Sequence, residues 1–166
     1  MPAQVPIAKF TWQTVIMHLP ARSPYWSHDN CGGQCMRANG SQLKASTIKH
    51  VGHVIVDRVD RKDHKSHAYV SVNRLASDSS RDRHTVIMAI GHLCRVGLLE
   101  RVWRGGGMGV ARKVSSVYAL TIPDAALLAL ADAPGDAIEQ VRQLLAEETA
   151  RQAAGQAPYQ WWERSG

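Results

Sequence analysis

The spacing of apolar residues becomes regular at Leu43 and predicts a long amphipathic helix there. Positions suited to a buried stripe then recur at steps of three and four residues: Leu43, Thr47, Ile48, Val51, Ile55 and Val59. Residues at this spacing share one face of an α-helix, so we expect about seventeen helical residues packed on one side. The charged run DRVDRKDHKSH (57–67) predicts a solvated loop at the end of this helix.

The next two elements are predicted to be a short strand and a short helix. Ala68–Val70 is β-prone, and Ser71 is a suitable N-cap for a helix over Val72–Ser77. The polar residues 78–81 break this helix. We therefore expect a tight turn before the next regular element.

A further helix is predicted over 82–95. Asp82 can cap it by accepting the amide hydrogen of Thr85, and Gly97 stands where a left-handed C-cap belongs. Its apolar residues follow the i, i+3, i+4, i+7 pattern: Val86, Ala89, Ile90 and Leu93. This face is expected to be buried against the two preceding helices, so the opposite face meets solvent.

Alternation of apolar and polar residues predicts two strands after this helix, Leu98–Trp103 and Ser116–Ile122. The segment 104–115 between them is rich in glycine and carries cations, which predicts a β-hairpin with a long basic tip. Two helical stretches follow, Asp124–Asp132 and Asp136–Ala153, each opened by an aspartate.

These patterns divide the chain into four parts. Residues 1–42 form an irregular N-terminal segment, in which Phe10–Leu19 is a short helix or strand and the rest has loop composition. Residues 43–122 form the core domain. Residues 123–153 form an acidic helical extension that packs on the core or dimerises, and residues 154–166 form an aromatic tail.

The order of elements from 43 to 122 is helix, strand, helix, turn, helix and β-hairpin, which is the order of a winged helix-turn-helix. The segment 71–102 (SVNRLASDSSRDRHTVIMAIGHLCRVGLLERV) resembles DNA-binding proteins of bacterial phages, plasmids and integrative elements, especially actinobacterial ones. The expected fold is therefore mainly α with a small β-hairpin: a winged helix-turn-helix core with a C-terminal helical extension.

The resemblance implies a recognition helix over 82–95 and a wing over 104–115. Arg83 is suited to a bidentate contact with guanine, while Arg81 is better placed for phosphate. The wing cations are expected against the DNA backbone or in a minor groove. The residues expected to contact DNA are Arg81, Arg83, His84, Ile87, Arg104, Arg112 and Lys113. The implied role is transcriptional regulation or replication control for a mobile element.

The sequence departs from the resembled pattern at three positions. Arg81 stands where an apolar residue is usual, and Ile87 and Met88 are apolar where exposed polar residues are usual. Thymine methyl groups can accept Ile87, but an apolar outer face equally suits a covering protein. The alternative function is thus a protein-interaction module, in which the winged helix binds a protein partner rather than bases.

The charge distribution supports a polyanionic partner. The net charge is +6, with cations in excess over 1–67 and 68–120 and anions in excess over 121–166. The longest apolar stretch, Ala125–Ala131, is far shorter than a membrane crossing. We therefore expect a cytoplasmic, nucleoid-associated protein with double-stranded DNA as its partner and no membrane contact.

The segment 28–35 (HDNCGGQC) places His28, Cys31 and Cys35 close together. Thiolates two to four residues apart are common zinc ligands, so a structural zinc is one interpretation. The sequence has no second cysteine pair, and the other interpretation is that these are ordinary loop residues. No other cofactor is expected.

Two further features complete the sequence-based expectations. The glycine-rich run at 105–109 lacks the Lys-Ser/Thr of a phosphate-binding loop, and no catalytic constellation is recognisable, so we expect no enzymatic activity. The stripe Ile138, Val141, Leu144 and Leu145 and the tail aromatics make 136–162 a candidate surface for a homodimer or protein partner.

Overall fold

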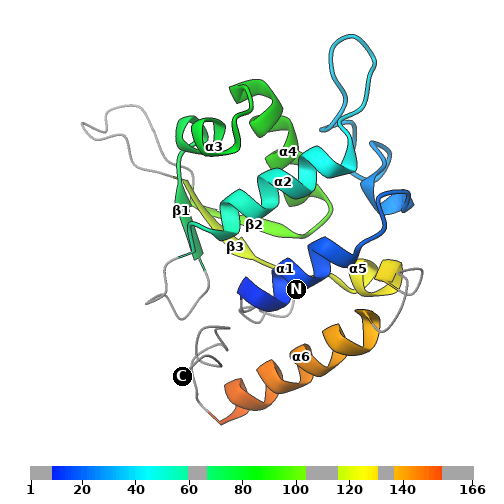
Figure 1. Cartoon of the computed structure of the whole chain (residues 1–166), viewed down its shortest axis with the longest axis vertical. Helices are drawn as coiled ribbons and strands as arrows, with labels where there is room; N and C mark the ends of the chain where they lie inside the picture. Colours follow the sequence, from blue (N-terminus) through cyan, green and yellow to red (C-terminus); the bar gives the residue numbers. More distant parts are fainter. Residues whose placement is uncertain (1–8, 60–66, 104–115, 131–136, 155–166) are drawn as a thin grey trace.

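A computed structural model of the 166-residue chain describes residues 9–59, 67–103, 116–130 and 137–154 (Figure 1). Among these residues lie six α-helices, one 3₁₀ helix and three strands. In chain order they are α1 (Lys9–His18), η1 (Pro24–Trp26), α2 (Ala45–Val56), β1 (His67–Val70), α3 (Val72–Ser79), α4 (Arg83–Arg95), β2 (Leu99–Trp103), β3 (Ser116–Leu120), α5 (Asp124–Ala129) and α6 (Ala137–Ala153).

Helices α2, α3 and α4 pack on one another and hold the centre of the core. The predicted stripe of α4 is fully or almost fully buried, as are Ile48, Val51 and Ile55 of α2. Helix α2 is shorter than predicted, because Leu43 precedes it and Val59 follows it. Both residues are nevertheless buried, and Val59 pairs with Ala68 in an isolated β-bridge. The apolar spacing extends beyond both ends of the helix because Leu43 and Val59, which are not helical, also point into the core.

The predicted helix caps are confirmed. The Ser71 hydroxyl accepts a hydrogen bond from the Arg74 amide at 3.2 Å. The Asp82 carboxylate accepts hydrogen bonds from the Thr85 amide at 3.1 Å and from its hydroxyl at 2.6 Å. These bonds stabilise the ionised carboxylate and hold the pKa of Asp82 below its usual value. Gly97 has a φ of +88° after α4, the left-handed conformation that glycine adopts without strain.

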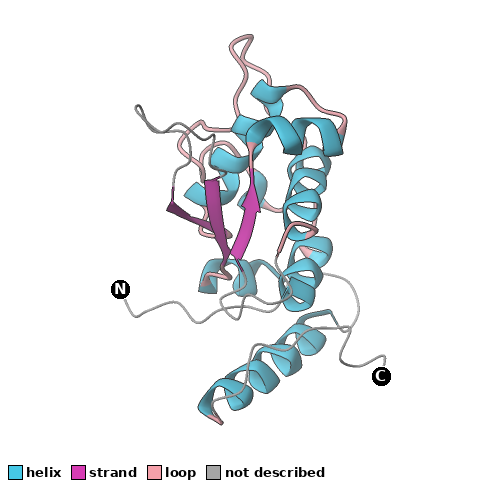
Figure 2. Ribbon diagram, turned by 90° about the vertical axis from the view of Figure 1, so that its left-hand side faces the viewer, coloured by secondary structure: helices cyan, strands magenta, loops and turns pink. Residues whose placement is uncertain are grey.

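The three strands form one antiparallel sheet in the order β1-β3-β2 (Figure 2). Strands β2 and β3 are the two predicted strands of the hairpin, with Leu99 opposite Leu120. Strand β1 joins the outer side of β3, with His67 opposite Ala119. The fold is therefore a set of helices with a small three-stranded sheet, in which β1 connects α2 to α3.

The N-terminal segment contributes directly to the hydrophobic core. Helix α1 buries Trp12, Val15, Ile16 and Leu19. The indole N–H of Trp12 donates to the carbonyls of Leu98 and Thr121, at 2.8 and 3.1 Å. This residue thereby ties α1 to the segments that lead into β2 and out of β3.

The C-terminal helix packs on the same chain. Helix α6 contacts α1, and its residues Val141 and Leu144 are buried (Figure 1). Part of the stripe that we considered for a partner is thus covered by α1. Among the described residues, no helix is both long and apolar enough to cross a membrane.

Candidate functional site

The first candidate site is the outer end of α4, which a tight turn connects to α3. Ser80 adopts the left-handed conformation (φ 55°) at the C-terminus of α3, and the Arg81 amide donates to the Ala76 carbonyl at 3.1 Å. The chain then reverses, and Asp82 caps α4. Arg81, Arg83 and His84 are all exposed as a result.

Ile87 lies one turn further along α4 and is 49% exposed. It follows Arg83 by four residues, so the two side chains share one face of the helix. The expectation that Met88 is exposed is wrong: Met88 is only 6% exposed and belongs to the hydrophobic core. Helix α4 contacts α2, α3 and β2 together, so its buried arc is wider than the single stripe that the spacing predicted.

The acidic residues near this surface already have partners. Asp78 of α3 forms ion pairs with Arg58 and with Arg74, the latter at 3.4 Å. Asp82 accepts the hydrogen bonds from Thr85. Within the described part of the chain, no ion pair is seen for the two arginines at 81 and 83. Both guanidinium groups therefore face solvent without an ion-pair partner.

The predicted wing residues Arg104, Arg112 and Lys113 lie outside the described residues. The base of the hairpin is described. The Tyr118 ring is buried under the Arg101 guanidinium, whose central carbon lies 5.6 Å from the ring centroid. Tyr118 therefore serves packing within the sheet.

The second candidate site is a buried cluster of Cys31, Cys35 and His92. All three residues are fully buried, and one possible ligand atom from each lies within 4.8 Å of the others. The two sulfur atoms are 3.3 Å apart and both cysteines are reduced. The cysteines come from the loop after η1, whereas His92 comes from the inner, C-terminal half of α4.

The cysteine loop has a compact backbone. Gly32 and Gly33 have φ angles of +65° and +83°, which allow a tight turn between the cysteines. The Cys35 amide donates a hydrogen bond to the Cys31 sulfur at 3.4 Å. The loop also packs closely on α4. The Gln34 side-chain oxygen lies so near Gly91 that a Cβ atom at that position would be only 2.8 Å away.

The electrostatics of this cluster follow from its burial. Desolvation lowers the pKa of His92 to about 4, although the nearby Tyr25 backbone carbonyl favours its protonation. Neither ring nitrogen of His92 has a hydrogen-bond partner. Desolvation, followed by the hydrogen bond between the two cysteine side chains, raises the pKa of Cys35 to about 12. Burial therefore favours the neutral forms of His92 and Cys35, and the His92 ring lacks hydrogen-bond partners.

His28, which the sequence grouped with the cysteines, lies outside this cluster. Its ring forms a hydrogen bond with the Gln42 side-chain oxygen at 2.8 Å and lies 3.2 Å from a carboxylate oxygen of Asp29. His92 was missed because it is remote in sequence and comes from another element. Its spacing of three residues from the apolar Ala89 was the available signal, since it places a polar ring on the inner side of α4.

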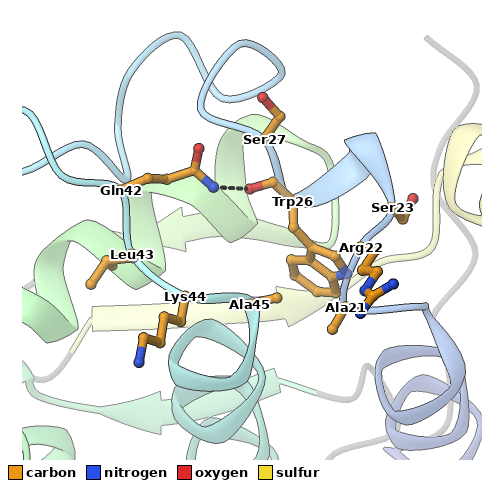
Figure 3. Close-up of a pocket in the computed structure, with 9 residues that line it drawn as sticks. All are labelled: Ala21, Arg22, Ser23, Trp26, Ser27, Gln42, Leu43, Lys44 and Ala45. Carbon is orange, nitrogen blue, oxygen red and sulfur yellow. Dashed lines mark hydrogen bonds between the residues drawn. The ribbon is translucent and has the colours of Figure 1, made fainter.

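A cavity of about 390 Å³ lies beside the second site, at the start of α2 (Figure 3). Arg22, Trp26 and Lys44 line it, and the Gln42 amide donates to the Trp26 carbonyl at 3.0 Å. The Trp26 ring also stacks on His92, with the ring centroids 5.8 Å apart. The cavity is thus separated from the cysteine cluster by one aromatic layer.

Comparison with models of known protein families, with curated proteins and with solved structures finds no match.

Proposed function

We propose that this chain binds double-stranded DNA through a winged helix-turn-helix, with α4 as the recognition helix. The observation that carries the proposal is the exposure of Arg83, His84 and Ile87 on the outer end of a helix whose other face is buried. A helix that is held by its inner face can place its N-terminal residues in a major groove. The proposed role is regulation of transcription or replication for a mobile element.

The connectivity supports this proposal. The series α2-β1-α3-α4-β2-β3 has the helix, strand, helix, helix and hairpin order of a winged helix-turn-helix. Strand β1 pairs with β3, so the hairpin is attached to the helices through the same sheet. In this proposal the segment between β2 and β3 is the wing, whose cations would contact DNA beside the groove that α4 enters.

The residue types suit complementary tasks. Arg83 would contact guanine, for which a bidentate pair is worth about 1–3 kcal/mol of discrimination. Arg81, in the turn before α4, would contact phosphate, and Ile87 would pack on a thymine methyl group. Asp78 is paired with arginines, and the ionised Asp82 is outnumbered by Arg81 and Arg83, so the net charge of the turn still favours the approach of a phosphate backbone.

The test is selection of duplexes from a random pool by the full chain, followed by fluorescence anisotropy with an enriched duplex and a scrambled duplex. We expect an enriched motif and a salt dependence with a log–log slope of about −4 to −5, as for about five neutralised phosphates. No enrichment, together with a slope near zero, would overturn the proposal.

The exposure of Ile87 also favours a second candidate, a protein-interaction module. Met88 cannot contribute to that surface because it is buried. The surface would then offer one isoleucine among cations, so an apolar partner would contact little area. Binding to such a partner would be almost insensitive to salt, which separates the two candidates in the same measurement.

A further inference from the structure

We propose that Cys31, Cys35 and His92 bind a zinc ion that fastens the cysteine loop to the inner half of α4. This site is independent of the proposed DNA surface, since its residues lie in the core and those at the outer end of α4 meet solvent. Cysteine sulfur and histidine nitrogen are the ligand types that zinc prefers in proteins, and this set of three leaves a fourth position open.

The distances suit one small ion. Zinc–sulfur bonds of about 2.3 Å and zinc–nitrogen bonds of about 2.0–2.1 Å place tetrahedral ligand atoms roughly 3.5–3.8 Å apart. The two sulfurs are 3.3 Å apart, and the third ligand atom lies within 4.8 Å of both. Small side-chain rotations therefore suffice to surround an ion. The sulfur separation is also well above the ~2.05 Å of a disulfide bond.

His92 is the independent observation that points to a ligand. Its ring is fully buried within the cluster, and both of its nitrogens lack a hydrogen-bond partner. A buried polar group without a partner is costly, and metal ligation would satisfy one nitrogen directly. The Tyr25 carbonyl near the ring could accept the N–H of the other nitrogen, which is the usual arrangement behind a ligating histidine.

The loop backbone favours the bound form of the cysteines. The Cys35 amide donates to the Cys31 sulfur, and such a bond stabilises a thiolate more than a thiol. The left-handed glycines between the cysteines bring both sulfurs to the same side of the turn. The described residues thus supply three ligands, and a water molecule would complete the tetrahedron.

The proposed ion would join two segments that are distant in sequence. The loop contacts α4 through Gln34 at Gly91 and through Gly32, whose Cβ position lies 3.7 Å from the Arg95 side chain. The Trp26 ring also stacks on His92. Zinc would connect the loop and α4 by metal–ligand bonds, which are stronger than the contacts between them.

The experiment titrates the metal-free, reduced full chain with Co²⁺ and then displaces it with Zn²⁺. We expect one equivalent of Co²⁺ to give thiolate-to-metal charge-transfer absorption together with the visible bands of a tetrahedral site. Cys31→Ser, Cys35→Ser and His92→Gln should each lower the affinity at least tenfold. Cys94→Ser and His84→Gln are the matched controls, since both residues lie on α4 outside the cluster, and they should bind as the wild type does.

A measurement on the wild type covers the case in which a core variant fails to fold. Stoichiometric Zn²⁺ should raise the Tm and should protect Cys31 and Cys35 from alkylation. Cys94 should react when the chain unfolds, whether or not the metal is present. The absence of both the cobalt charge-transfer band and the Tm shift would overturn the proposal. An unchanged band in folded His92→Gln would overturn it too. Because no DNA is present, these outcomes are independent of the DNA-binding proposal.

Discussion

The two ends of α4 differ in almost every physical respect. At the outer end, Arg83 and Ile87 face solvent, and the charges there are hydrated. At the inner end, His92 and Leu93 are fully buried, and His92 packs against the cysteine pair and Trp26. The outer end is therefore suited to meeting a partner, while the inner end determines where the helix sits. A side chain that reads bases needs such rigid support, since small displacements remove its hydrogen bonds.

The difference predicts opposite consequences for truncating an apolar side chain at each end. Leu93→Ala should lower the free energy of unfolding by about 2–5 kcal/mol, because it leaves a cavity in the core. Ile87→Ala should change it by no more than about 0.5 kcal/mol, because the side chain is half exposed. Urea unfolding of both variants measures the contrast, and equal losses would contradict it.

Metal removal tests whether the inner end depends on zinc. If the site is occupied at 100 to 1,000 times the dissociation constant, chelation should lower the free energy of unfolding by about 3–4 kcal/mol. The loss should be restored by Zn²⁺ and should be absent from Cys35→Ser. Thermal unfolding with and without chelator provides the measurement. A Cys35→Ser variant that responds to the chelator as the wild type does would place the metal elsewhere.

The outer end is tested by Arg83→Ala. Loss of the Arg83 side chain should reduce the difference in binding free energy between the two duplexes by about 1–3 kcal/mol, without changing the stability of the protein. Arg142→Ala removes the same charge from an exposed position on α6, at the opposite end of the molecule from α4, and serves as the control (Figure 1). Anisotropy with the enriched and scrambled duplexes measures both variants. Equal effects of the two substitutions would show that Arg83 acts only through net charge.

His92→Phe tests the energetic cost of the buried His92 nitrogens at the inner end of α4. The substitution keeps an aromatic ring against Trp26 but removes two nitrogens that have no partner. The metal-free variant should therefore be about 1 kcal/mol more stable than the metal-free wild type, and it should not respond to Zn²⁺. Chemical unfolding in the presence of chelator tests this. Destabilisation of the metal-free variant would mean that His92 contributes polar contacts of its own.

The smallest effect is expected at the Asp82 cap. The Thr85 hydrogen bonds depress the pKa of this carboxyl in the folded state, so the unfolded state binds the proton more readily. The stabilisation is present above the ordinary aspartate pKa of 3.8 and is lost as the pH falls through the folded-state value. Asp82→Asn keeps a capping oxygen but cannot titrate. Unfolding at pH 7 and pH 3 should show a weaker acid sensitivity in this variant.

Local patterns predicted the elements along 43–122 well. The caps at Ser71 and Asp82 and the stripe around Val86 depend on residues within one or two turns, so the sequence alone contains the necessary information. The hairpin strands were readable for the same reason. Met88 was the exception, since its burial depends on how many neighbours surround α4.

The helices and strands along 43–122 and the cationic outer end of α4 can be predicted from sequence, because they follow from periodicity, capping and hydration of charge over short distances. Long-range packing brings α1 into the core, lays α6 on α1 and places His92 beside Cys31 and Cys35. These contacts join residues that are far apart in the chain. Their proximity results from chain packing as a whole, which no local spacing encodes.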